Sequence, residues 1–145
     1  MNHLASLGML IGRIALAAIF ILAGLGKFMN VEATSAYMAS KGMTMIPFFL
    51  YSAALLEILA GLALLIGYKT RWAALLLALF IIPTVLIFHD FWNVSGPLER
   101  TIELTQFLKD WAIFGGLLYV AALGAGRYSI DQCCCDKHCD VNHKG

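Results

Sequence analysis

The chain consists of long apolar stretches separated by short polar connections. Each stretch carries apolar residues on every side of a helix, a pattern typical of helices that lie in a membrane or in a large core. A membrane-spanning helix takes about 20 mostly apolar residues. The pattern therefore predicts four spans, at about residues 4–25, 46–66, 72–88 and 107–123. The polar connections are expected at about residues 28–45, 67–71 and 90–106.

Proline and glycine positions agree with these helices. Pro47 opens the second stretch, where a missing amide hydrogen does little harm, and Gly67 follows its last residue. Pro83 is expected to bend the third helix, with neighbouring helices satisfying the freed carbonyl. The predicted fold is an all-α integral membrane protein: an antiparallel four-helix bundle over residues 1–126, with a polar tail over residues 127–145.

Composition supports a membrane protein. Of the 145 residues, 61% are hydrophobic and 13% are charged, whereas soluble domains have about half apolar and about a quarter charged residues. A soluble globule of this size could not bury so many apolar side chains. The lipid bilayer is therefore the expected partner. The net charge is +1 and the Lys and Arg residues are scattered, which excludes a nucleic-acid surface because phosphates require clustered cations.

The Lys and Arg residues near the predicted membrane ends favour one orientation, since such cations are more frequent on the cytoplasmic side. With both termini in the cytoplasm, five cations lie inside and four outside. The five are Lys69, Arg71, Arg127, Lys137 and Lys144, and the four are Lys27, Lys41, Arg100 and Lys109. Both termini are therefore predicted to be cytoplasmic.

Two charged residues lie deep inside predicted spans. Arg13 is in the first span and Glu57 is in the second, and a charge at such a depth is costly unless it has a partner, a polar pocket or a function. Counted from the ends of the two spans, the two residues have the same depth in an antiparallel hairpin, so an Arg–carboxylate pair is expected. Such a pair could fix the register of the helices, or it could hold a polar head group, carry protons or bind a substrate.

A second polar group is predicted at the opposite ends of the spans. Its members are Lys27, His89, Asp90, Lys109 and Asp110. Histidine exchanges protons near neutral pH, and a neighbouring carboxylate can orient it. Two tryptophans of the same region either stack on a planar ligand or form the aromatic belt that anchors bundle ends; they are Trp92 and Trp111.

The tail is rich in cysteine and histidine. The candidate metal ligands are Cys133, Cys134, Cys135, His138, Cys139 and His143. Thiolates and imidazoles suit zinc or cuprous copper, although the spacing matches no closed zinc motif. Adjacent cysteines can also form strained, easily reduced disulfides and relay electrons or thiols. An adventitiously metal-binding terminus and a lipid-modified cysteine are the alternatives.

Taken together, these landmarks resemble the DoxX family of small bacterial four-helix membrane proteins, over about residues 8–131. The resemblance rests on Arg13, Phe20, Gly24 and Lys27, on Tyr37, Met38, Ala39, Ser40 and Gly42, on Glu57, Gly61, Gly67 and Arg71, on His89, Phe91 and Trp92, and on Gly124, Gly126, Ser129, Ile130 and Asp131. It implies this fold, the bacterial inner membrane, and a quinone- or thiol-linked redox role. The cysteine-rich tail extends beyond the usual family ending.

Two functions from different classes follow from these residues. The first is a membrane oxidoreductase linked to quinone or thiols, with Glu57, His89 and Arg13 as catalytic residues and Arg13, Lys27 and Trp92 holding the quinone. Quinone reduction needs two protons with its two electrons and an apolar site for the ring. The second is a non-catalytic membrane subunit that docks a redox partner protein and binds metal through its tail.

Overall fold

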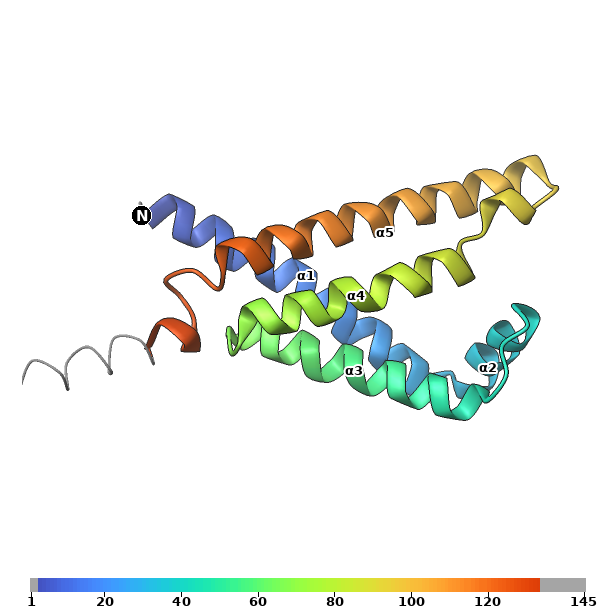
Figure 1. The fold of residues 1–145 in the computed structure, drawn as a ribbon, viewed down its shortest axis with the longest axis horizontal. Helices are drawn as coiled ribbons and strands as arrows, with labels where there is room; N and C mark the ends of the chain where they lie inside the picture. Colours follow the sequence, from blue (N-terminus) through green and yellow to red (C-terminus); the bar gives the residue numbers. More distant parts are fainter. Residues whose placement is uncertain (1–2, 134–145) are drawn as a thin grey trace, which may run out of the picture.

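The computed structural model describes residues 3–133 (Figure 1). Its helices are α1 (His3–Met29), α2 (Val31–Ser40), α3 (Ile46–Ile66), α4 (Thr70–Phe88) and α5 (Pro97–Leu123), with a short 3-10 helix, η1 (Phe91–Asn93), before α5. Within the described residues, three segments are long and apolar enough to cross a membrane: α1, α3, and Thr70–Asn93, which combines α4 and η1. The chain is an all-α, multi-pass membrane protein.

The long helices α1, α3, α4 and α5 form the predicted antiparallel bundle (Figure 1). α1 packs along α3, α4 packs along α5, and α3 joins the two pairs through its contact with α4. The start of α1 and residues 124–133 lie at one end of the bundle, which we call the terminal end. The short helix α2 lies at the other end and contacts α3, so we call this end the α2 end.

Side-chain burial reflects a lipid environment. The core between the helices contains the buried residues Ala17, Phe20, Leu64, Leu77 and Leu117. The outer faces also carry large apolar side chains, as the exposure of Leu22 and Leu79 illustrates. An apolar outer surface on several helices is unfavourable in water and suits the bilayer core.

Two of the predicted connections are helical. α2 occupies most of the expected loop at 28–45, and α5 begins at Pro97, well before the predicted fourth span. The apolar pattern predicts only the part of a helix that is suited to lipid. The helix α5 begins ten residues before that part, at Pro97. Pro97 is well suited to a first helical turn, and the Leu, Glu and Arg residues after it favour helix although the segment is polar.

Close contact between α1 and α3 depends on two glycines. At Gly24, an added Cβ would lie 2.7 Å from Cγ1 of Ile58 and 2.8 Å from the carbonyl oxygen of Ala54. At Gly61, it would lie 2.9 Å from Cγ1 of Ile21. Small residues let helix backbones approach closely in membranes. The two contacts also fix the register, because each glycine must face its partner helix at one position.

Replacing Gly24 by Ala is expected to lower the free energy of unfolding by about 1–3 kcal/mol, because the added methyl group overpacks the contact with the backbone of α3. Gly26 on the same helix is the control, since nothing lies within 4 Å of a Cβ added there. Gly26→Ala should leave stability unchanged or raise it by up to about 1 kcal/mol through helix propensity. Thermal unfolding of both variants in one detergent tests this, and equal unfolding temperatures would contradict the packing argument.

Candidate functional site

The buried carboxylate of Glu57 forms an ion pair with the partly buried Lys27. Glu57 lies on α3 and is 4% exposed, and both of its carboxylate oxygens accept hydrogen bonds from Nζ of Lys27 on α1, at 2.9 and 2.7 Å. Two hydrogen bonds to one ammonium compensate much of the cost of burying the carboxylate. The deepest acid of the predicted second span therefore has a cation partner on the neighbouring helix.

The predicted pair between Arg13 and Glu57 does not form. The prediction assumed that the start of α1 and the end of α3 lie at the same level. In the structure, the first turns of α1 extend past the end of α3 (Figure 1). Arg13 lies beside Gly67, which follows the last residue of α3: its Nη1 would be 3.0 Å from a Cβ added there. Glu57 lies ten residues before Gly67, or about 15 Å along the helix at about 1.5 Å per residue.

Arg13 contacts the C-terminal end of the bundle instead. Its side chain is buried, with 2% of the residue exposed, and its guanidinium donates to the carbonyl oxygen of Ala125 and, at 2.7 Å, to that of Tyr128. Both carbonyls belong to residues 124–131, which we call the C-terminal return because they fold back from α5 toward α1 and α4. The first residues of the predicted polar tail are therefore part of the packed structure.

Asp131 closes the C-terminal return onto α4. Its two carboxylate oxygens accept hydrogen bonds from the backbone amides of Lys69 and Thr70, at 2.7 and 2.9 Å, and its own amide donates to the carbonyl of Gly67. Burial acts to raise the pKa of Asp131, but the hydrogen bonds from Thr70 and Lys69 and the charge of Arg13 hold this pKa below its ordinary value. Asp131 thus supplies the N-terminal cap of α4.

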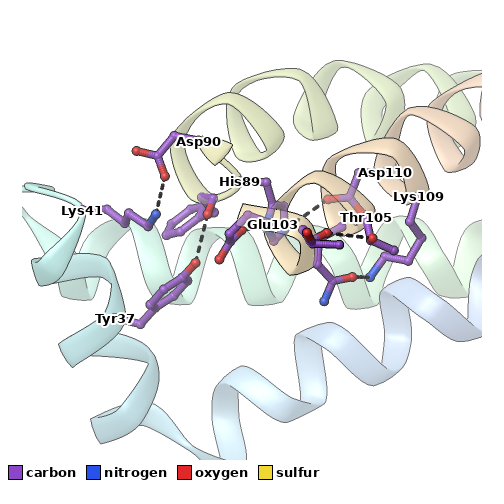
Figure 2. Close-up of polar contacts among 11 residues, drawn as sticks. Tyr37, Lys41, His89, Asp90, Glu103, Thr105, Lys109 and Asp110 are labelled. Atoms are coloured by element: carbon purple, nitrogen blue, oxygen red, sulfur yellow. Dashed lines mark hydrogen bonds and ion pairs between the residues drawn. The ribbon is translucent and has the colours of Figure 1, made fainter. Parts of the chain in front are cut away.

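At the α2 end, His89 lies between two carboxylates of α5. Its Nδ1 is 2.8 Å from Oε2 of Glu103, and its Nε2 is 3.4 Å from Oδ2 of Asp110. Figure 2 shows the imidazole at the end of α4 facing both acids. Glu103 and Asp110 are seven residues apart and share one face of a helix. The structure confirms the predicted proximity of His89 and Asp110 and adds Glu103, which the sequence interpretation missed.

The other members of the predicted polar group have separate partners. Lys27 pairs with Glu57, as described above, and Lys109 donates to Gln106 at 2.6 Å. Asp90 pairs with Lys41, which was not in the predicted group: Nζ of Lys41 lies 2.5 Å from Oδ1 of Asp90 (Figure 2). This hydrogen bond raises the pKa of Lys41. The five polar residues predicted at this end are therefore divided among several pairs.

A row of aromatic rings begins at Phe91, two residues after His89 in the chain. The rings contact one another edge to face, with centroids 5.1 to 6.1 Å apart. The row consists of Phe91, Trp92, Phe107, Trp111 and Phe114. Half of Trp92 is exposed. An imidazole between two carboxylates can exchange protons with a polar atom of a ligand, and the half-exposed ring of Trp92 can pack against a planar part of it.

The predicted quinone-holding residues do not share one place. Arg13 lies at the terminal end in contact with the C-terminal return, whereas Trp92 belongs to η1, next to His89. Lys27 contacts Glu57 between α1 and α3. Only Trp92 among these three belongs to the aromatic row beside His89.

The predicted metal centre lies mostly outside the described residues. Cys133 is described and is exposed. The remaining predicted ligands, Cys134, Cys135, His138, Cys139 and His143, are outside the described part of the chain. Among residues 3–133, no group of three or more His, Cys, Asp and Glu side chains is placed to hold a metal ion.

Comparison with known proteins places these residues in a family. The chain is 36% identical to inner membrane protein YqjF of Escherichia coli K12 over 91% of its length and 95% of that protein. It is 33% identical to inner membrane protein YphA of the same organism, over 86% of this chain and 88% of that protein. A shorter match, 31% identical over 53% of this chain and 24% of the relative, links it to the ER-derived vesicles protein ERV29 of Saccharomyces cerevisiae. No solved structure matches. Residues 8–90 match the DoxX family, and the chain belongs to that family.

Proposed function

We propose that this protein is a quinone- or thiol-linked redox component of the bacterial inner membrane, with His89 as its proton-exchanging residue. The observation that carries the proposal is the position of His89 between Glu103 and Asp110. The aromatic row includes Phe107, which lies on α5 between Glu103 and Asp110 in sequence, the two acids that contact His89. The names of the two Escherichia coli relatives support the inner membrane.

The proposed reaction balances protons and electrons. A dithiol that closes to a disulfide releases two electrons and two protons, and a quinone that becomes a quinol takes up the same number. In the proposed step, His89 gives a proton from Nε2, whose contact with Asp110 is the longer one at 3.4 Å, to a ring oxygen of the quinone, and Glu103 at Nδ1 passes a proton released by the dithiol back to the imidazole. A second round of the same transfer supplies the second proton. Trp92, at the open end of the aromatic row, packs against the ring. General acid–base catalysis of this kind contributes about 10²- to 10⁴-fold to a rate.

The other predicted catalytic residues have different parts in this proposal. Glu57 remains a candidate second proton carrier, because it is a carboxylate inside a spanning helix with only Lys27 as its hydrogen-bonding partner among the described contacts. Arg13 is assigned a structural role, since its guanidinium donates to two backbone carbonyls. A zinc or copper ion, if bound, would be held by the tail residues from Cys133 to His143.

His89→Asn is expected to lower quinone reduction at least a hundredfold without unfolding the protein. The full chain is purified anaerobically in mild detergent, and the reduction of a short-chain quinone by a dithiol is followed by absorbance. His3→Asn is the matched control, because His3 is exposed at the start of α1. Equal turnover of His89→Asn and the unchanged protein would eliminate the proposed role of His89.

The docking subunit is the second candidate function. It is favoured by the C-terminal return, which fixes the position of Cys133, the first of the predicted metal ligands, against the bundle. The same preparation distinguishes the two functions. Absence of turnover together with bound zinc or copper that is lost after Cys133, Cys134, Cys135 and Cys139 are replaced by Ser would support the docking subunit.

A further inference from the structure

A basic pocket lies at the terminal end, apart from the site at His89. It has a volume of about 890 Å³, and its lining includes Lys69, Arg71 and Arg127 as well as the start of α4. Among the described residues that line it, Asp131 is the one carboxylate, and it already accepts hydrogen bonds from the first amides of α4. Among the described residues, neither Arg71 nor Arg127 forms an ion pair. The pocket therefore holds an excess of positive charge.

The start of α4 does not supply the anion site in this pocket. Thr70 is fully buried and belongs to the pocket lining, and its backbone amide donates to the carboxylate of Asp131 at 2.9 Å. A phosphate in the pocket would therefore contact the side chains of Arg71 and Arg127, which form no ion pair among the described residues.

The basic pocket continues into an apolar groove between α1 and α5. The groove has a volume of about 390 Å³ and shares Met9, Leu123 and Gly124 with the basic pocket. Gly8 and Gly12 line this groove and face open space, since nothing lies within 4 Å of a Cβ added at either position.

Arg13 marks the polar side of the groove. It lines the groove and is 2% exposed. Its Nε has no hydrogen-bond partner among the described residues, although its other guanidinium nitrogens are bound to carbonyls. The apolar helix of a second copy could pack on the glycines but would leave Nε unpaired. An acyl ester oxygen would satisfy it.

We propose that these two connected spaces bind an anionic phospholipid, with the phosphate in the basic pocket and one acyl chain in the apolar groove. Basic pockets between membrane helices are typical sites for anionic lipid head groups. Trp72, which is 74% exposed and also lines the pocket, is suited to the membrane–water interface. The continuous apolar groove distinguishes a lipid from a free phosphate ion, which would need only the cations.

The test is native mass spectrometry of the full chain in detergent, with added phosphatidylglycerol or phosphatidylcholine of the same acyl chains. The bound fraction should favour phosphatidylglycerol about tenfold. The double variant Arg71→Gln/Arg127→Gln should bind the two lipids equally, because the two cations near the head group together supply the preference. Arg100→Gln/Lys109→Gln removes the same charge from exposed positions of α5 and should bind like the unchanged protein.

Two further variants separate a lipid from a free anion. Gly12→Leu fills the groove and should weaken phosphatidylglycerol binding about tenfold, whereas Gly26→Leu adds the same side chain to α1 outside the groove and should have no effect. Inorganic phosphate at millimolar concentration should not displace the lipid. Equal binding of the two lipids overturns the proposal. Full displacement by phosphate, with no effect of Gly12→Leu, also overturns it in favour of a site for a free anion.

Discussion

Lys27→Met is expected to lower the free energy of unfolding by about 3–5 kcal/mol, because it leaves the carboxylate of Glu57 buried without a partner. The side chain of Glu57 is 5% exposed in the ion pair, and its two oxygens share one ammonium as donor. Water cannot readily replace that ammonium inside a spanning helix. Thermal unfolding in detergent, followed by tryptophan fluorescence, measures the loss.

Lys41→Met is the matched control for this substitution. Lys41 also pairs with a carboxylate, but Asp90 lies after the end of α4, its side chain is 20% exposed, and it accepts a second hydrogen bond from Asn93. The loss should be no more than about 1 kcal/mol, as for other pairs near water. Lys27→Met combined with Glu57→Leu should recover most of the stability, since no unpaired charge remains. Equal losses in the two single variants would contradict the role assigned to burial.

The sequence predicts the helices better than it predicts their relative positions. The second span was expected at residues 46–66, and α3 has these bounds, because an apolar stretch between Pro47 and Gly67 has clear ends. The register of α1 against α3 depends instead on the close contacts of Gly24 and Gly61. These contacts join residues far apart in the sequence, so no count along either span could have placed Arg13 beside Gly67.

The candidate site at His89 was predicted only in part for a related reason. The segment 97–106 is polar, and its interpretation as a connection hid the helix that places Glu103 and Asp110 on one face. The seven-residue spacing of these acids was the available signal, once the segment is recognised as helical. The partners of Arg13 left no such signal, because they are the backbone carbonyls of Ala125 and Tyr128. Every residue has a backbone carbonyl, so the sequence does not indicate which ones accept.

Arg13→Met is expected to release the C-terminal return from the bundle. Each hydrogen bond from a charged group contributes about 1.5–3 kcal/mol, and Arg13 makes two of them, to Ala125 and Tyr128. Their loss should raise the population of the open form at least about a hundredfold, since about 1.4 kcal/mol corresponds to a tenfold change. Cleavage by trypsin after Arg127, which lies within the return, should accelerate by the same factor when opening is fast relative to cleavage.

Arg13→Lys separates the hydrogen bonds from the charge at this position. A lysine keeps the positive charge near Asp131 but lacks the planar fork that reaches two carbonyls, so cleavage after Arg127 should accelerate only about tenfold. Cleavage after Arg100, in the first turns of α5, is the internal control. Acceleration at Arg127 alone would show local opening of the return, because global unfolding would expose both sites. An unchanged rate at Arg127 in Arg13→Met would mean that Asp131 and its contacts with α4 hold the return without help from Arg13.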